Sequence, residues 1–457
     1  MKKVLSLVLA LALVLGCMSI AGAEAPKTKL VVWSFTNELQ GMIEKYYAPN
    51  HPEIEFEFQI YPTDGSAYET KVDNTLGVPD AAVSEEAPDI FTLEAAFVKH
   101  YVESDFTGNL KDIGFTDDEL AVAFPVMAQI GQNSNGIQKG LSWQSTPGVL
   151  MYRASLAEKY LGVTSPEEMQ AKVADWDTFL ETAEELKEKS EGACKMVTGS
   201  GDIWNAYQYQ RAAGWVVDGK LNIDDELLDF EELVKTMYQD DLTQKAGAWG
   251  ETWFAGMQGV NETLCYFLPT WGLHYTLKPN CGQGTNDKMT EEELSTYNLE
   301  NGNGTYGDWR ITDGPVAYSW GGTWMGVNAA KVATADDAKK AAMHDLIKFF
   351  TLDDDFLTQY AADSGDFVGS AKAVETILAN GGTPNPFLGG QDHYAIFAKA
   401  AALANGSLMS EYDSTINDLW DKFVTTPYTK GEVESVDDAI AEFKNQVKSV
   451  ITTIEVD

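Results

Sequence analysis

The stretch Tyr318-Ser-Trp-Gly-Gly-Thr-Trp-Met-Gly-Val-Asn328 contains two indoles within five positions, a pair of glycines between them and an apolar exit. Because glycine has no Cβ, the pair would let the backbone come close to a flat ligand face. If the stretch is a strand, alternation puts Trp320, Gly322 and Trp324 on one face. If Gly321-Gly322 is a turn, Trp320 stays at the loop tip and Trp324 enters the core. An ordinary core strand preceded by a turn would show the same pattern, so the rest of the chain has to decide.

Length and charge set the first limits. A chain of 457 residues is too long for one ordinary core, which predicts two domains or lobes. There are 70 Asp and Glu against 32 Lys and Arg, for a net charge of −38. Nucleic acid and anionic membranes would be repelled by this charge, so neither is expected as a partner.

The N-terminus has the features of a targeting segment. Met1-Lys2-Lys3 is basic, and the apolar run from Val4 to Gly16 is too short to span a bilayer as a mature helix. Two cleavage sites compete. Val14-Leu15-Gly16-Cys17 resembles a lipobox, which would remove residues 1–16 and lipidate Cys17, whereas Ala21-Gly22-Ala23 would end a signal peptide at residue 23. Either way, an exported protein is predicted.

The cysteines and histidines give no metal pattern. Cys194, Cys265 and Cys281 have no zinc-like spacing, and no HxxxH or HxH occurs, so no metal and no cofactor are expected. Cys265 and Cys281 could form a disulfide, with buried free thiols as the alternative. Gly302-x-Gly304-x-x-Gly307 follows no strand and opens no helix, so a loop is predicted there.

The first part of the mature chain alternates strands and helices. Leu30-Val-Val-Trp33 indicates a buried strand, residues 54–60 alternate as in a half-buried strand, and Asp89 to Leu93 indicate a third. This order implies a mostly parallel sheet with right-handed crossovers. Such sheets bind ligands beyond the carboxyl ends of their strands, where Trp33, Phe35 and Glu94 would lie.

Further along, the same signals continue. Residues 140–153 read as a strand, a Pro-Gly break and a second strand, and Asp175 begins an amphipathic helix through Lys189. A strand is expected at 264–271 and a polar insertion at 279–308. A helix should begin near Thr334, taken as its N-cap, and Ser435 should cap the last helix of the chain.

Taken together, the mature chain resembles the extracellular solute-binding proteins of carbohydrate ABC importers, the maltose-binding-protein-like group (solute-binding protein family 1). The resemblance rests on the order and spacing of several pieces over most of the chain. They are the exported N-terminus, Leu30-Val-Val-Trp33, Ala87-Pro-Asp-Ile90, Pro147-Gly-Val-Leu-Met-Tyr-Arg153, Trp176-Asp-Thr-Phe179, Gly321-Gly322 ahead of Trp324-Met-Gly-Val-Asn-Ala-Ala-Lys331, and the helix from Ala341 to Phe350.

The resemblance implies an α/β fold of two lobes of the periplasmic-binding-protein type. Each lobe would be a mostly parallel sheet flanked by helices, and a hinge of several crossings would join them. The N-terminal lobe would hold residues 27–145 and 272–328, and the C-terminal lobe 149–268 and 332–457. The ligand would lie between the lobes and close the hinge as it binds.

A sugar site needs aromatic planes for the C–H faces of the ring and polar groups for its hydroxyls. The stacking candidates, aromatic side chains near expected strand ends or loops, are Trp33, Phe35, Trp143, Trp204, Tyr207, Trp271, Trp320 and Trp324. The polar candidates are Glu38, Glu94, Gln144 and Asp202, and Gly322 would open a slot between two indoles. Any one of these indoles could equally belong to the core.

The leading hypothesis is a monomeric, non-enzymatic receptor that captures a sugar, an oligosaccharide in particular, and delivers it to the transmembrane subunits of an ABC permease. It would work at the cell surface as a lipoprotein, or in the periplasm or outside the cell. A secreted glycoside hydrolase is an alternative, because it also needs aromatics beside carboxylates. A glycan-binding adhesin or sensor is another.

Overall fold

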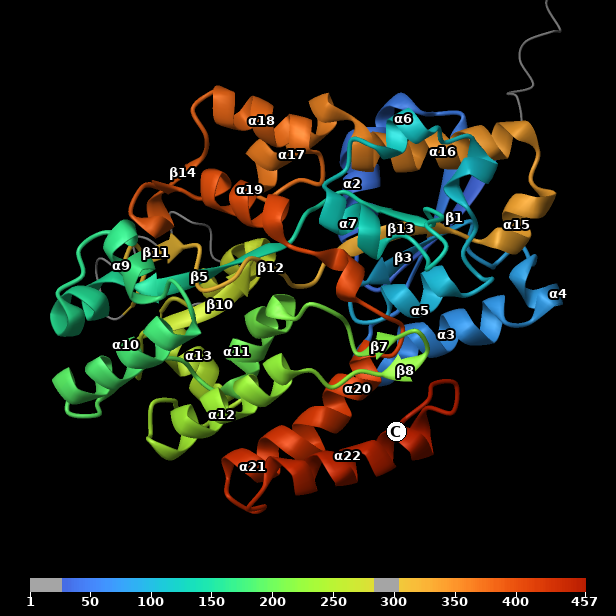
Figure 1. Ribbon diagram of the computed structural model, residues 1–457. Helices are drawn as coiled ribbons and strands as arrows, with labels where there is room; N and C mark the ends of the chain where they lie inside the picture. Colours follow the sequence, from blue (N-terminus) through green and yellow to red (C-terminus); the bar gives the residue numbers. More distant parts are fainter. Residues whose placement is uncertain (1–26, 283–303) are drawn as a thin grey trace, which may run out of the picture.

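The computed structural model describes residues 27–282 and 304–457, which form two α/β lobes with a sheet in each (Figure 1). One sheet lies on the right of Figure 1 and the other on the left. The two-lobe α/β fold expected from the sequence is confirmed. The predicted cleavage sites, Cys17 and Gly302 lie outside the described residues.

The first sheet has the strand order β2-β1-β3-β13-β4. Its strands are β1 (Thr28–Ser34), β2 (Ile54–Ile60), β3 (Ile90–Glu94), β4 (Gly140–Ser142) and β13 (Thr323–Val327). β1 is parallel to β2 and β3, whereas β13 is antiparallel to β3 and β4. The unbroken apolar run in β1 fits its place between two strands, because residues 30–34 are all buried.

Helices from both halves of the sequence cover this sheet (Figure 1). They are α2 (Glu38–Met42), α3 (Ala67–Leu76), α4 (Pro79–Ala82), α5 (Val98–Glu103), α6 (Asp117–Leu120), α7 (Pro125–Ile130), α15 (Ala329–Thr334) and α16 (Asp337–Leu352). The expected N-cap of the helix after the opening stretch was wrong by two positions. Thr334 ends α15, and the Asp336 carboxylate caps α16 by accepting a hydrogen bond from the Lys339 N–H.

The second sheet is built around β5 (Pro147–Arg153). β10 (Cys265–Pro269) pairs with one edge of β5. The other edge of β5 pairs first with β11 (Trp309–Thr312) and then with β12 (Tyr318–Ser319). All of these pairs are antiparallel, so the expectation of a mostly parallel sheet in the second lobe was wrong. The physical reason is that β5 carries the chain away from the first lobe, whereas β10 and β12 run back toward it.

The remaining helices include α8 (Ala154–Leu156), α9 (Pro166–Lys172), α10 (Trp176–Lys189), α11 (Ser200–Tyr207), α12 (Asp225–Gln239), α13 (Glu251–Met257), α17 (Asp354–Ser364), α18 (Ala371–Ala379), α19 (His393–Leu403), α20 (Asp413–Trp420), α21 (Thr426–Thr429) and α22 (Val436–Val450). Short two-residue strands are β6 (Cys194–Lys195), β7 (Val216–Val217), β8 (Lys220–Leu221), β9 (Glu262–Thr263), β14 (Pro384–Asn385) and β15 (Gln391–Asp392).

Strand pairing and helix packing correct two parts of the expected lobe boundaries. β11 and β12 fall in the range assigned to the first lobe, but they bond to β5 of the second sheet. α16 falls in the range assigned to the second lobe, but it packs on β1. Chain order alone does not show which sheet a returning segment joins. The other boundaries stay a proposal.

The chain crosses between the two sheets at residues 143–146 and 320–322, and these crossings are tied together. The Trp320 N–H donates to the Thr146 carbonyl over 3.0 Å, and the Thr146 hydroxyl donates to the Gly321 carbonyl over 2.8 Å. A bond network of this kind fixes where the second crossing lies relative to the first.

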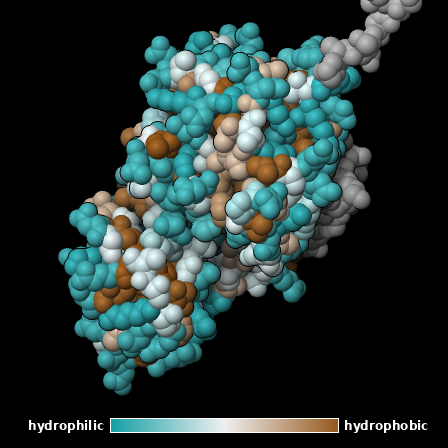
Figure 2. All heavy atoms as spheres, turned by 90° about the vertical axis from the view of Figure 1, so that its right-hand side faces the viewer, coloured by the Kyte–Doolittle hydropathy of each residue, from teal (hydrophilic) through white to brown (hydrophobic). Residues whose placement is uncertain are grey.

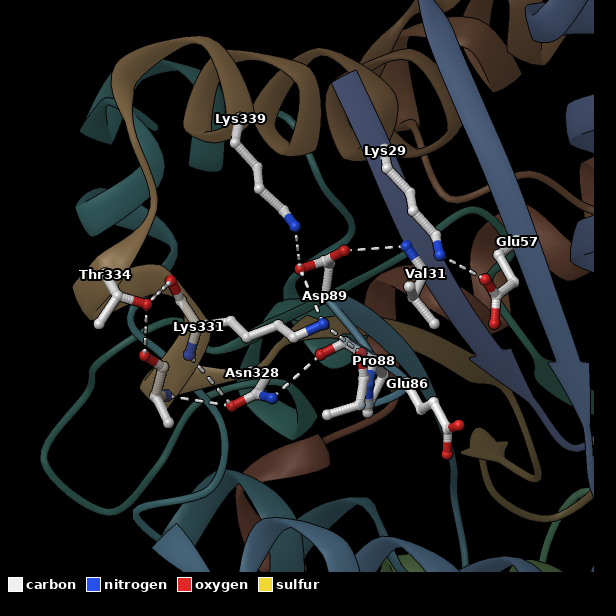
Figure 3. A network of polar contacts seen from close by, with 12 residues as sticks. Lys29, Val31, Glu57, Glu86, Pro88, Asp89, Asn328, Lys331, Thr334 and Lys339 are labelled. Carbon is white, nitrogen blue, oxygen red and sulfur yellow. Dashed lines mark hydrogen bonds and ion pairs between the residues drawn. The ribbon is translucent and has the colours of Figure 1, made fainter. Parts of the chain in front are cut away.

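A buried ionic network lies at the end of the first sheet that is remote from these crossings (Figure 3). Asp89, which is fully buried, accepts a hydrogen bond from the Val31 N–H over 2.8 Å and forms ion pairs with Lys339 at 2.8 Å and Lys331 at 3.5 Å. Asn328 bonds the backbone just before Asp89 at the Pro88 carbonyl. The network therefore joins β1, the start of β3 and the segment that follows β13.

The surface of the protein is polar on the face that Figure 2 shows, and its described cysteines are buried. Figure 2 shows a face that is mostly hydrophilic, with hydrophobic side chains in separate groups. Within the described ranges, no helix has the length and apolarity to cross a bilayer. Cys265 is a buried free thiol, as is Cys194, so the disulfide considered between Cys265 and Cys281 is not formed.

Candidate functional site

A cavity of about 320 Å³ opens between the two lobes. The first lobe contributes the end of β3 and the start of α5, with Glu94, Lys99 and His100. The second lobe contributes the end of α11 and residues 409–418, which lead into α20. Ser319 at the end of β12, with Trp320 and Gly321 of the crossing that follows, forms the wall where the lobes meet. The cavity thus lies beyond the carboxyl end of a parallel strand, where open α/β sheets bind ligands, and its volume is in the range of small-molecule sites.

The glycine pair of the opening stretch is a turn. Gly321 and Gly322 have φ angles of 82° and 118°, which side chains with a Cβ rarely adopt. A Cβ on Gly321 would also lie 2.5 Å from the Trp271 indole nitrogen. The turn resets the alternation: Trp324 is fully buried and donates to the Met127 carbonyl over 2.9 Å, while Trp320 remains half-buried at the cavity. Of the two geometries open at the outset, the turn is confirmed.

Three indoles form a cluster that begins at the cavity wall. Trp320 meets Trp271 edge to face with ring centroids 5.1 Å apart, and Trp271 donates from its indole N–H to the Trp320 carbonyl. Trp249 lies parallel to Trp271 at 6.1 Å and is 54% exposed. Its φ of 67° is strained for a bulky residue. Trp249 is thus stacked on Trp271 and meets Trp320 edge to face, and it provides a flat apolar surface beside the indole that lines the cavity.

Charge in the cavity is predominantly negative. Burial raises the pKa of the Glu94 carboxyl, although the backbone N–H groups of Ala96 and Ala95 partly offset this effect. Burial also raises the pKa of Asp413 to about 6, against the opposing influence of Ser410. Lys99 faces them from α5, and burial lowers the pKa of its ammonium. Carboxyl groups with raised pKa values in a cavity are good hydrogen-bonding partners for hydroxyls.

The structure brings only part of the predicted set to the cavity. Glu94, Trp204 and Trp320 line it. Trp271 packs against Trp320, and Gly322 is the second residue of the turn that follows Trp320. Phe35 is half-buried and packs edge to face against Tyr68 and Phe97. Glu38 is half-buried and accepts a hydrogen bond from the Tyr360 hydroxyl over 2.9 Å.

The remaining candidates lie in the interior and offer a ligand no surface in this structure. They are Trp33, Trp143, Gln144, Asp202, Tyr207 and Trp324. Trp33 and Trp143 sit in the main core, which is where large apolar rings gain most from burial. Asp202 is held by the Trp253 indole N–H at 3.0 Å and the Thr198 N–H at 3.1 Å. These two bonds give Asp202 a structural role near the start of α11, and burial raises its pKa to about 6.

Several lining residues were absent from the sequence prediction. They come from α5, the end of α11 and the approach to α20, and are Lys99, His100, Asn205, Gln208, Tyr209, Met409, Ser410, Glu411, Asp413, Ser414, Asn417 and Asp418. Helix α20 is amphipathic, with Ile416 and Trp420 buried, so the sequence pattern could have predicted its polar face. That this face meets Glu94 across the cavity depends on tertiary structure. Among the residues that the structure describes, no group of three or more His, Cys, Asp or Glu side chains could hold a metal ion.

Comparison with known proteins agrees with this architecture. The sequence profile for bacterial extracellular solute-binding proteins matches residues 42–400. A crystal structure described as extracellular solute-binding protein family 1 has a TM-score of 0.76 and 16% identity, over 92% of this chain and 99% of that one. No match was found among curated proteins.

Two sugar-binding proteins have the same fold. MalE from Xanthomonas citri matches with a TM-score of 0.69 and 14% identity, over 93% of this chain and 98% of its own. The galacto-N-biose-/lacto-N-biose I-binding protein of an ABC transporter from Bifidobacterium longum matches at 0.66 and 15%, over 95% and 100%. The chain belongs to the bacterial extracellular solute-binding proteins, and its fold is that of the maltose-binding-protein-like group.

Proposed function

We propose that this protein is the substrate-binding component of an ABC importer and captures a glycan in the cavity between its lobes. The observation that carries the proposal is the cavity itself, which both lobes line and in which indoles stand beside carboxylates. Trp204 and Trp320 supply apolar rings, and Glu94, Asn205, Gln208 and Asn417 supply polar partners for hydroxyls. Similar proteins named for sugars support this choice of ligand class.

The proposal extends to partners and location. Family membership supports an exported protein that delivers its ligand to transmembrane permease subunits. A signal peptide ending at Ala23, or a lipid on Cys17, would serve that location. We propose a monomer that binds neither nucleic acid nor a cofactor, and that closes around its ligand through differential contacts with the two lobes.

Calorimetry against a panel of mono- and oligosaccharides tests this function, with product analysis on the same samples. We expect at least one glycan to bind at one site per chain and to be recovered intact, because binding requires no proton-transfer pair across a scissile bond. Hydrolysis by the pure protein that disappears with Glu94→Gln or Asp413→Asn would instead favour the glycoside hydrolase. Absence of binding by every glycan would contradict the ligand class.

Trp320 offers a specific mutational test. Trp320→Ala should weaken glycan binding by about 1–3 kcal/mol, because a ring at the cavity wall is lost. The melting temperature without glycan should change little, since Trp320 is half-buried. Affinity comes from calorimetry and stability from thermal unfolding.

Trp324→Ala is the matched control, four residues along the same stretch. This indole is fully buried, so its loss should cost about 3–5 kcal/mol of stability. If Trp320→Ala instead lowered stability as much as Trp324→Ala and left affinity unchanged, Trp320 would be a core residue.

A further inference from the structure

The cavity carries more negative than positive side chains. Its lining includes four carboxylates, Glu94, Glu411, Asp413 and Asp418, and one ammonium, that of Lys99. Three of these carboxylates lie on the second lobe, around the start of α20, and Glu94 faces them from the end of β3. A ligand held between the lobes therefore meets carboxylates on both sides.

The basic side chains near the cavity already have partners within the protein. Lys99 is buried, and its ammonium donates to the carbonyls of Gln129 and Gln132, each over 2.9 Å. His100 has its Nε2 3.9 Å from an Asp73 carboxylate oxygen. Arg211 lies close by in an adjoining small cavity, where its guanidinium bonds Asp224 at 3.0 Å and covers the Trp215 ring. Each of these basic side chains therefore already has a partner within the protein.

The carboxylates are less engaged. Glu94 accepts a hydrogen bond from the Ala96 N–H over 2.7 Å, and Asp413 accepts a hydrogen bond from the Ser410 hydroxyl. Glu411 and Asp418 are exposed at the rim and form no ion pair within the described part of the chain. An anionic group entering here would lose its hydration and gain no counter-charge, whereas a hydroxyl or an ammonium group would find acceptors.

We propose that the site selects its glycan by charge: it binds neutral sugars and amino sugars and rejects those that carry a carboxylate, sulfate or phosphate. This inference rests on the proposed function and narrows its substrate class. The carboxylates of the cavity attract hydroxyl and ammonium groups and repel anionic groups, because unpaired like charges across an interface oppose binding strongly. The acidic charge of the whole chain, −38, acts in the same direction at long range.

The experiment uses matched disaccharides built on glucose, galactose and N-acetylglucosamine, each in neutral, amino and uronic-acid form. Binding is measured by calorimetry on the full mature protein at pH 7.5 in 20 mM salt. For the scaffold that binds best, the uronic-acid form should bind on the order of 100-fold more weakly than the neutral form. The ratio of the two dissociation constants, uronic-acid form to neutral form, measures this selectivity. In 500 mM salt this ratio should shrink, because the rim charges are screened.

Variants at the exposed rim show whether these carboxylates are responsible. In the double variant Glu411→Gln and Asp418→Asn, the ratio should fall at least about tenfold, with little effect on folding because both side chains are exposed. Glu158→Gln combined with Glu188→Gln removes two exposed carboxylates outside the cavity lining and controls for the change in net charge. The ratio should not change in that variant.

The outcomes separate the two proposals. Equal or tighter binding of uronic-acid forms would overturn charge selection and leave glycan capture standing. An unchanged ratio in the rim variant would overturn the assignment to these carboxylates. If no form of any scaffold binds, the proposed function itself fails.

Discussion

Asp89→Ala should lower the free energy of unfolding by about 3–5 kcal/mol, because it breaks a buried ion network and leaves its cations unpaired. Asp89 is the common partner of Lys331, Lys339 and the Val31 N–H, and its side chain is fully buried (Figure 3). Urea or guanidinium denaturation of the variant and the wild type measures the difference in their free energies of unfolding. Glycan affinity should stay the same, because Asp89 precedes β3 whereas the cavity begins at Glu94, where β3 ends.

The control lies on neighbouring strands. Lys29 and Glu57 form an ion pair of 2.6 Å between β1 and β2, but both side chains are well exposed to solvent. Glu57→Ala should therefore cost no more than about 1 kcal/mol. If the two variants were equally destabilised, burial of the Asp89 network would not be what makes it important.

The sequence predicted the fold best where the local pattern and the final environment agree. The alternation in residues 54–60 became β2, an edge strand of its sheet, and Asp175 caps α10 as expected. The antiparallel second sheet was missed because periodicity shows that a segment is a strand but not which strand it pairs with. The pairing of β5 with β11 joins residues more than 150 positions apart.

The site was only partly predictable for a related reason. An indole gains from burial in a core and also from stacking on a ligand, so its identity does not distinguish Trp33, which is buried, from Trp320, which lines the cavity. The turn at Gly321 and Gly322 did carry the necessary information, because it placed Trp320 and Trp324 in different environments. Trp249 gave no comparable signal: its strained φ of 67° is a property of the folded backbone.

A buried carboxyl group gives the last prediction. Glu231 on α12 has no exposed surface, and one of its oxygens accepts hydrogen bonds from the Trp420 indole N–H at 2.7 Å and the Thr425 hydroxyl at 2.6 Å. Its other oxygen is buried without a hydrogen-bond partner among the described residues. Burial raises the pKa of Glu231 from 4.5 to about 7, although the two donors oppose the shift. The bonds matter for the site, since Trp420 ends α20, the helix that carries Asp413 to the cavity.

The sign of the pH effect follows from this raised pKa. Below pH 4.5 the carboxyl is protonated in both the folded and the unfolded chain, so the group does not affect stability. Between pH 4.5 and about 7 the unfolded chain ionises while the folded protein keeps its proton, and the free energy of unfolding falls. Above pH 7 the loss is complete, at roughly 3 kcal/mol from the shift in pKa.

Glu231→Gln removes this titration and keeps an acceptor for Trp420 and Thr425. We expect the variant to be less stable than, or similar to, the wild type at pH 4.5 and to gain about 3 kcal/mol relative to it by pH 7.5. Denaturation curves across this range measure the change, and other titrating groups cancel in the difference between the two proteins. Glu232→Gln, the exposed neighbour on the same helix, should parallel the wild type throughout. A constant difference between Glu231→Gln and the wild type from pH 4.5 to 7.5 would show that Glu231 ionises at the same pH in the folded and the unfolded chain, in which case burial does not raise its pKa.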